Sequence, residues 1–318
     1  MTAPTEGTGR APVPSSVHRP RPRLHRDPPA SRLHRPMPRA PRPSRPFRSR
    51  SGPAMKLLVD AAILGVVGIA VTLSAAGVEA QTAVPTTVTV RVVSNDAKLI
   101  GTGVGGARVT IRDDQTGQIL ARGVHEGSTG DTERIMGPRD RGDDVFSTEG
   151  AAGFATVLRL TEPRRVEIEA LGPLGTPHAR QRATRTVLLV PGEDLVGDGV
   201  VLTLNGFTVE LLEPGGRRLA VSRNESLPIR ARVTMLCGCP TEPGGRWDAD
   251  GFSIRAQWVM DRRVVFETPL SFSGTTSEYQ ATLEVPDQAG TFVLRILASD
   301  AGRANAGMVE VQGTIAPG

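Results

Sequence analysis

The two cysteines of the chain, Cys237 and Cys239, flank a single glycine in the stretch VTMLCGCPTEPGGRWDADGF, residues 233–252. In a straight strand, residues i and i+2 have Cα atoms about 6.5–7 Å apart and side chains on the same face. That separation lies at the upper limit for a disulfide, and Gly238 permits the bend that would close one. Because such a small ring constrains little of the unfolded chain, we expect it to add little stability.

Two other chemistries remain open for this pair. The thiolates of Cys237 and Cys239, together with the thioether of Met235, are soft ligands that suit Cu(I). Zn²⁺ prefers four ligands, and no histidine lies nearby in the sequence. A small strained ring is also easily reduced, which would suit a protein that exchanges disulfides. We favour a local disulfide and keep copper binding and thiol redox chemistry as alternatives.

The residues after the cysteines form a polar segment rich in proline and glycine, which is typical of a loop. Pro240, Arg246, Trp247 and Asp248 are its candidate binding residues. We expect Asp248 and Asp250 to accept hydrogen bonds from the local backbone, and Trp247 to cover one end of a β-sandwich.

The sequence supports no catalytic site. After residue 80 it contains only two histidines, His125 and His178, both predicted to lie in exposed loops, and no hydrolase, zinc-protease or nucleotide-binding motif. Six carboxylates in the segment Val124–Thr148 could gather Ca²⁺, but their spacing matches no EF-hand and three arginines compete for them. We expect a solvated loop there; its carboxylates are Glu126, Asp131, Glu133, Asp140, Asp143 and Asp144.

The positive charge of the chain is confined to its first residues. The net charge is +5, but residues 1–54 contain 12 arginines against Glu6 and Asp27, whereas the rest carries 26 basic and 31 acidic residues. The remainder is therefore mildly acidic, with no basic stripe, which excludes nucleic-acid binding by the folded part.

The N-terminal region predicts export. Residues 1–54 are rich in arginine and proline and predict disorder, unless translation begins at Met55. Residues 55–80 have a positive start, an apolar run and small residues before Gln81, which is typical of a signal peptide. The uncharged run 61–78 is also long enough for a membrane anchor. Both interpretations place residues 81–318 in the periplasm or outside the cell.

The exported part predicts an all-β fold of two tandem antiparallel sandwiches, residues 81–204 and 205–318. Apolar residues alternate in short segments separated by turns. In the first half these segments are Thr87–Val93, Ala107–Asp113, Phe154–Leu160, Arg164–Ala170, Thr184–Val190 and Val200–Leu204.

The stretches GVGGARVTIRDDQTGQILARG, STEGAAGFATVLRL and RRVEIEALGP give the first half a family resemblance. It resembles the carboxypeptidase regulatory-like domain, a prealbumin-like sandwich, over about residues 85–204. The matching positions are turn and core residues, so the resemblance implies a fold and no catalysis: Gly106, Ala107, Thr116, Gly117, Thr148 and Phe154.

The second half repeats the pattern over seven segments, which suits one immunoglobulin-like sandwich. Its ending, AGTFVLRILASDAGRANAG, resembles the last hairpin of bacterial Ig-like domains, and Trp258 is expected in the core. The segments are Phe207–Glu213, Ser226–Leu236, Phe252–Met260, Val264–Phe272, Glu278–Val285, Thr291–Asp300 and Gly307–Ile315.

These patterns predict an exported, non-catalytic binding, adhesion-type or accessory protein that contacts protein or glycan at the cell envelope through its loops. They predict no cofactor other than the copper alternative, and membrane contact only if residues 61–78 stay as an anchor. The alternative function is a periplasmic copper or thiol-redox protein that uses Cys237 and Cys239.

Overall fold

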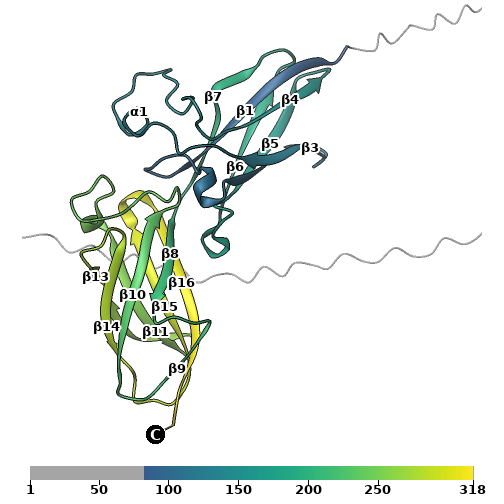
Figure 1. The fold of residues 1–318 in the computed structure, drawn as a ribbon. Coiled ribbons are helices and arrows are strands. Elements are labelled where there is room, and N and C mark those ends of the chain that lie inside the picture. The colour runs from purple at the N-terminus through teal and green to yellow at the C-terminus, as the bar shows by residue number, and fades with distance from the viewer. Residues whose placement is uncertain (1–81, 318) are drawn as a thin grey trace, which may run out of the picture. The chain divides into compact units, whose positions relative to one another are not determined.

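The computed structural model describes residues 82–317. The predicted leader, residues 1–54, and the predicted signal peptide or anchor, residues 55–80, lie outside the described residues. The regular structure of residues 82–317 is mainly β-strand, as predicted, with sixteen strands and one short α-helix (Figure 1). No helix among them is both long enough and apolar enough to cross a membrane.

Residues 84–204 form two sheets, which we call the N-terminal sheet pair. Their strand orders are β4-β1-β7 and β3-β2-β5-β6. Side chains that alternate along β1 face the core, where Val88, Val90 and Val92 have no exposed surface. The strands are β1 (Val84–Ser94), β2 (Ala107–Asp113), β3 (Ile119–His125), β4 (Phe154–Leu160), β5 (Arg164–Gly172), β6 (Gln181–Leu189) and β7 (Leu195–Leu204).

Residues 207–315 form the C-terminal sheet pair, with strand orders β13-β14-β10-β8 and β12-β11-β15-β16-β9. Trp258, fully buried, lies 4.2 Å from Phe292 between ring centroids in its core, as predicted for this tryptophan. The strands are β8 (Phe207–Glu213), β9 (Arg218–Val221), β10 (Ser226–Met235), β11 (Ser253–Met260), β12 (Arg263–Pro269), β13 (Ser271–Phe272), β14 (Glu278–Glu284), β15 (Gly290–Asp300) and β16 (Asn305–Ile315).

Most strand pairs are antiparallel, and the exceptions are β1 with β7 and β9 with β16, which are parallel. The β1–β7 register shifts between Val88 and Val90, so β7 has a bulge there. Gly199 lies in this bulge with φ +56°, and a Cβ atom on it would meet the Thr89 carbonyl oxygen at 2.2 Å. The bulge therefore requires glycine at this position.

Short helices complete the described fold. The α-helix α1 (Thr132–Met136) begins after Asp131, whose carboxylate accepts a hydrogen bond from the Arg134 N–H at 2.8 Å. The 3₁₀ turns are η1 (Thr102–Val104), η2 (Pro177–Ala179), η3 (Ala249–Gly251) and η4 (Ala301–Arg303).

The predicted strands differ from the observed ones in three places. β3 and β9 were not predicted, and the predicted strand Val264–Phe272 divides into β12 and β13. The division occurs at Leu270, because β12 pairs with β11 in one sheet while β13 pairs with β14 in the other. The buried Leu270 is thus where the chain changes sheets.

The segment between β3 and β4, residues 126–153, is not the wholly solvated loop that its carboxylates predicted. Its residues Ile135, Val145 and Phe146 are buried in a small apolar cluster with Val93 and Leu99. The apolar side chains therefore determine how the segment packs, and the carboxylates face solvent around this cluster.

Two polar groups of the sheets hold this segment in place. The Arg91 guanidinium donates to the carbonyl oxygens of Ala151 and Ala152 at 3.1 and 2.5 Å. The Asp198 carboxylate accepts hydrogen bonds from the backbone N–H groups of Val145 and Phe146 at 2.8 and 2.7 Å.

The prediction that His125 lies in an exposed loop is wrong. It is the last residue of β3 and has no exposed surface. Its Nε2 accepts a hydrogen bond from the Val92 N–H at 3.0 Å, and its Nδ1 lies 2.9 Å from the Ile100 carbonyl oxygen. Burial lowers the pKa of His125 to about 4, so the imidazole is neutral in the folded protein. His178 is exposed, as expected.

Candidate functional site

The chain turns sharply where β10 ends, and the turn contains both cysteines. Cys237 and Cys239 form a disulfide with a Cα–Cα separation of 5.4 Å. Gly238, with φ +77°, brings the two closer than a straight strand allows. Its N–H donates to the Met235 carbonyl oxygen at 2.8 Å, and the Met235 N–H donates to the Cys239 carbonyl oxygen at 3.1 Å.

The three sulfur-containing residues at this turn are buried. Cys237 and Cys239 are 4% and 5% exposed, and Met235 is 1% exposed within the core of the C-terminal sheet pair. In residues 82–317, no three His, Cys, Asp or Glu side chains are grouped so that they could hold a metal ion. Both cysteine sulfurs are bonded to one another and are not thiolates in this state.

We call residues 236–252 the Cys237 loop. After the cysteines, this loop is held by hydrogen bonds to its own backbone. The Asp248 carboxylate accepts hydrogen bonds from the N–H groups of Asp250 and Gly244, at 3.0 and 2.8 Å. These bonds lower the pKa of Asp248 below its usual value. The expected carboxylate role is thus confirmed for Asp248, whereas Asp250 contributes its backbone N–H to the turn.

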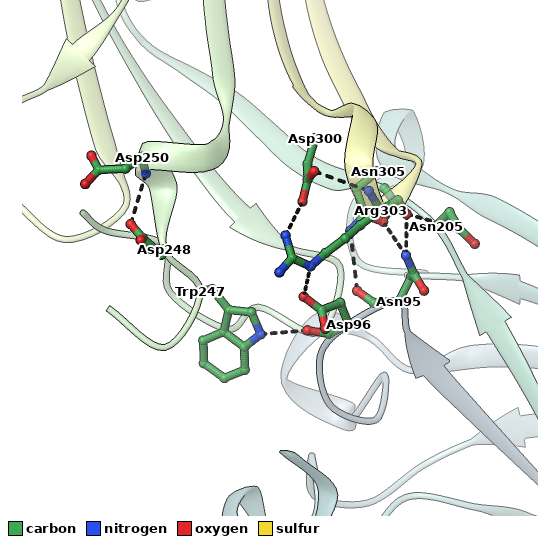
Figure 2. Close-up of polar contacts among 10 residues, drawn as sticks. Asn95, Asp96, Asn205, Trp247, Asp248, Asp250, Asp300, Arg303 and Asn305 are labelled. Atoms are coloured by element: carbon green, nitrogen blue, oxygen red, sulfur yellow. Dashed lines mark hydrogen bonds and ion pairs between the residues drawn. The ribbon is translucent and has the colours of Figure 1, made fainter. Parts of the chain in front are cut away.

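Trp247 lies at the contact between the two sheet pairs, where the sequence predicted only a cover for one sandwich end. Its indole Nε1–H donates to the Asp96 carbonyl oxygen at 3.0 Å, and its side chain is 8% exposed (Figure 2). A buried indole N–H usually finds an acceptor, and here this bond fixes the Cys237 loop against the turn after β1.

Arg303 makes a second polar connection at the same contact. Its guanidinium forms ion pairs with Asp96 at 2.6 Å and Asp300 at 3.2 Å, and these carboxylates raise its pKa (Figure 2). The Asn95 side-chain amide donates to the Arg303 carbonyl oxygen at 2.6 Å. The connection between β7 and β8 is only Asn205 and Gly206, and the Gly206 N–H donates to Asn305 Oδ1 at 2.9 Å.

The Cys237 loop also meets the 126–153 segment, more than a hundred residues earlier in the chain. Arg246 forms an ion pair with Glu133, and near it Lys98 Nζ donates to Thr132 Oγ1 at 2.9 Å. A hollow of about 280 Å³ lies between these groups. We call its lining the loop surface: Lys98, Thr129, Thr132, Cys237, Gly238, Cys239, Pro240, Arg246 and Trp247.

Six of the seven candidate residues lie on or beside this surface. Three of the six are exposed: Pro240, Arg246 and Asp248. The other three are buried: Cys237, Cys239 and Trp247. All six except Asp248 line the hollow. Met235 points into the core and is separate from it.

Sequence reasoning missed the residues that the N-terminal sheet pair contributes. Lys98, Thr129 and Thr132 line the same hollow. Lys98 carried a usable signal, because it and Lys56 are the only lysines in the chain. The threonines carried none, since nothing in their local sequence distinguishes them from other loop residues.

Comparison with known proteins adds little beyond the kind of fold. No protein-family model and no curated protein matches the chain. Among solved structures, the chain is similar to an engineered protein at 18% identity, with 41% of this chain and 24% of that protein covered and a TM-score of 0.26.

Two further similar structures are named for fibronectin- and immunoglobulin-type modules. Fibronectin(III)-like modules of Clostridium thermocellum CbhA are 13% identical, over 65% of this chain and 77% of theirs, with a TM-score of 0.24. Dpr2 Ig1-Ig2, solved in complex with DIP-Theta, is 11% identical over 73% of this chain and all of that chain (100%), with a TM-score of 0.26. At these scores the fold class is argued from the strand pairing of the chain itself: the protein is an all-β chain of sandwich-type sheets.

Proposed function

We propose that this protein is an exported, non-catalytic binding or accessory module that contacts a protein or glycan partner at the cell envelope through the loop surface. One observation carries the proposal. Two loops that are far apart in sequence, the Cys237 loop and the 126–153 segment, meet around one hollow and are tied together by the Arg246–Glu133 ion pair. Convergent loops on a β-scaffold are a common way to build a recognition surface.

The composition of the surface favours recognition of a partner over chemistry on a substrate. An aromatic ring, a proline and two cationic side chains lie together at Trp247, Pro240, Lys98 and Arg246. Aromatic and arginine side chains are the residue types that contribute most to binding in protein interfaces. The Trp247 hydrogen bond and the disulfide hold the loop in one conformation, which reduces the entropy lost on binding.

Export and the domain limits belong to the same proposal. The signal-peptide pattern of residues 55–80 supports export, with a mature end at Gln81, and N-terminal sequencing of the protein recovered from cells tests it. We also propose that residues 81–204 form a carboxypeptidase regulatory-like domain and residues 205–318 an Ig-like domain. Separate expression of the two, followed by thermal unfolding of each, tests whether each folds alone.

The binding experiment uses the full chain on two probes, purified peptidoglycan and an extract of envelope proteins immobilised on beads. A Lys98→Ala/Arg246→Ala variant should reduce retention on one of the probes by roughly tenfold, the effect of losing about 1.4 kcal/mol. Arg217→Ala removes an exposed arginine outside the loop surface and serves as the matched control. Equal retention of all three proteins on both probes would show that the loop surface does not bind.

A second candidate function uses the disulfide itself. Cys237 and Cys239 line the hollow, so a reductant or a partner thiol that entered it would come close to the disulfide. As the alternative function we propose thiol exchange at the disulfide. A variant of it is Cu(I) binding once the disulfide is reduced, with the two thiolates and the Met235 thioether as ligands. Counting free thiols by mass spectrometry before and after mild reduction, and then titrating Cu(I), tests it. A pair that stays oxidised and takes up no copper would remove this candidate.

A further inference from the structure

A second cavity, of about 540 Å³, lies on the C-terminal sheet pair, on the outer face of the sheet β12-β11-β15-β16-β9. One row of paired residues crosses it from strand to strand: Val259, Val293, Gln312 and Arg218. Trp258, next to Val259, points into the core, so this row faces outward. The cavity is within the size range of sites for small ligands.

The lining is cationic. Arg218, Arg262 and Arg295 contribute three guanidinium groups, against the two carboxylates of Asp261 and Glu310. Glu310 is already held by Arg295, with Nε and Oε1 2.8 Å apart. Among residues 82–317, Arg218 and Arg262 form no ion pair, so both are free to bind an anion.

The hairpin at the mouth of this cavity holds Arg262 in an unfavourable backbone conformation. Asp261 and Arg262 are the two residues between β11 and β12, with φ of +49° and +63°. Two-residue hairpins of this kind favour glycine at the second position, because a Cβ atom is unfavourable at positive φ. An arginine at this position is therefore less favourable for the stability of the turn than glycine. What it contributes instead is a positive charge in the cavity lining.

The other lining groups indicate what accompanies the anion. The floor is a sheet whose strands are paired on both sides, so a ligand meets side chains and not free backbone groups. Those side chains are the hydroxyls of Thr291 and Thr314, the amide of Gln312 and the apolar surface of Val259 and Val293. Hydroxyl and amide groups suit the hydroxyls of a sugar, whereas an extended peptide would need backbone partners.

We propose that this cavity binds an acidic oligosaccharide, with Arg218 and Arg262 each holding the carboxylate of a different sugar unit and the threonine and glutamine side chains holding sugar hydroxyls. Guanidinium groups bind carboxylates through paired, charge-assisted hydrogen bonds. The site is separate from the loop surface, so it stands or fails independently of the function proposed above.

The test is calorimetric titration of the full chain with trigalacturonate at physiological salt, which limits non-specific binding to the arginine-rich N-terminal residues. Arg262→Gly should weaken binding roughly tenfold or more, as expected for a lost guanidinium–carboxylate pair. The same variant should keep or raise the thermal midpoint, because glycine relieves the backbone at this turn. Arg218→Gln should weaken binding without a change in fold.

Two controls make the result specific. Arg217→Gln, an exposed neighbour outside the cavity, should bind as the unchanged protein does. The methyl ester of the same sugar, which lacks the charge, should bind about tenfold more weakly. The proposal is overturned if triglutamate binds as tightly as trigalacturonate, if Arg217→Gln loses as much as Arg262→Gly, or if no arginine-dependent binding occurs up to about 10 mM sugar.

Discussion

The two sheet pairs are both β-sandwich structures, but their interiors are stabilised by different groups. The N-terminal pair has an aliphatic core in which the buried His125 imidazole links β1 to β3, and Arg91 and Asp198 bind the 126–153 segment. The C-terminal pair contains all three aromatic contacts found in residues 82–317, including Trp258 against Phe292. Similar sheets can thus depend on hydrogen bonds to buried polar groups in one case and on the packing of large aromatic side chains in the other.

This difference predicts two kinds of vulnerability. Burying a neutral imidazole ties the stability of the N-terminal pair to pH, since protonation would place a charge where there is no water. An aromatic core is indifferent to mild acid but sensitive to lost volume.

The largest effect is expected from Trp258→Ala. Trp258 is fully buried, so its removal leaves a large cavity and should lower the free energy of unfolding of the C-terminal pair by about 3–5 kcal/mol. Urea denaturation followed by circular dichroism measures it. Trp258→Phe is the matched control: it leaves a smaller cavity and also removes the indole N–H, which is buried without an acceptor. If both variants lose the same amount, packing volume is not what matters there.

Acid should destabilise the N-terminal pair selectively. The pKa of His125 is about 4 in the folded state against 6.5 when exposed, so the unfolded chain binds the proton more readily. The contribution of the neutral imidazole is complete above pH 6.5 and is lost as the pH falls toward 4, by up to about 3 kcal/mol. Hydrogen exchange of amides in β1 and β3, compared with those in β11 and β15, measures the difference between pairs.

A His125→Asn variant should be less stable at neutral pH but should lose most of this pH dependence between pH 6.5 and 4. The C-terminal amides should exchange alike in the variant and the unchanged protein. A pH dependence that survives the substitution would assign the acid sensitivity to carboxylates instead.

Removing the disulfide should have a smaller effect, confined to the C-terminal pair. A ring closed between residues two apart in sequence restricts the unfolded chain little, so Cys237→Ala/Cys239→Ala should cost less than about 2 kcal/mol. Thermal unfolding with and without reductant measures it, and the variant should be insensitive to the reductant. A loss several times larger would mean that the disulfide supports the sheet contact as well as the loop.

The smallest effect concerns the contact between the pairs. Trp247→Phe replaces the indole with a smaller aromatic ring and loses the hydrogen bond to the Asp96 carbonyl oxygen, at a cost of about 1 kcal/mol. Hydrogen exchange should increase in both residues 94–99 and the Cys237 loop. Arg246→Ala breaks only an exposed ion pair and should change the stability by less than about 1 kcal/mol. Faster exchange in the Cys237 loop alone would show that Trp247 does not couple the two pairs.

Much of the fold could be predicted because half-buried strands show an alternating pattern. β2, β4 and β8 have the predicted bounds. β3 escaped prediction because Gly123 interrupts its pattern; the ring of Phe154 occupies the space that a side chain there would need. β9 is only four residues long, too short for periodicity to register.

The contacts of the candidate site were less predictable. The acceptor for Trp247 is a backbone carbonyl about 150 residues earlier, and a carbonyl has no signature in the sequence. The burial of His125 likewise follows from packing against β1 and the turn after it, while its sequence neighbours Val124 and Glu126 are both exposed. The loop residues themselves were identified because cysteine, tryptophan and proline are uncommon together, and this depends only on composition.

The parallel pairing of β1 with β7 has a mechanical consequence. β1 is where the described chain enters the N-terminal sheet pair, and β7 is where it leaves for β8 through two residues. A pull on the chain in opposite directions from residues 84 and 204 therefore slides β1 along β7. The hydrogen bonds that join the stretch Val90–Ser94 of β1 to β7 are then loaded at the same time. Sharing the load in this way makes rupture under tension slow, whatever the equilibrium stability of the pair.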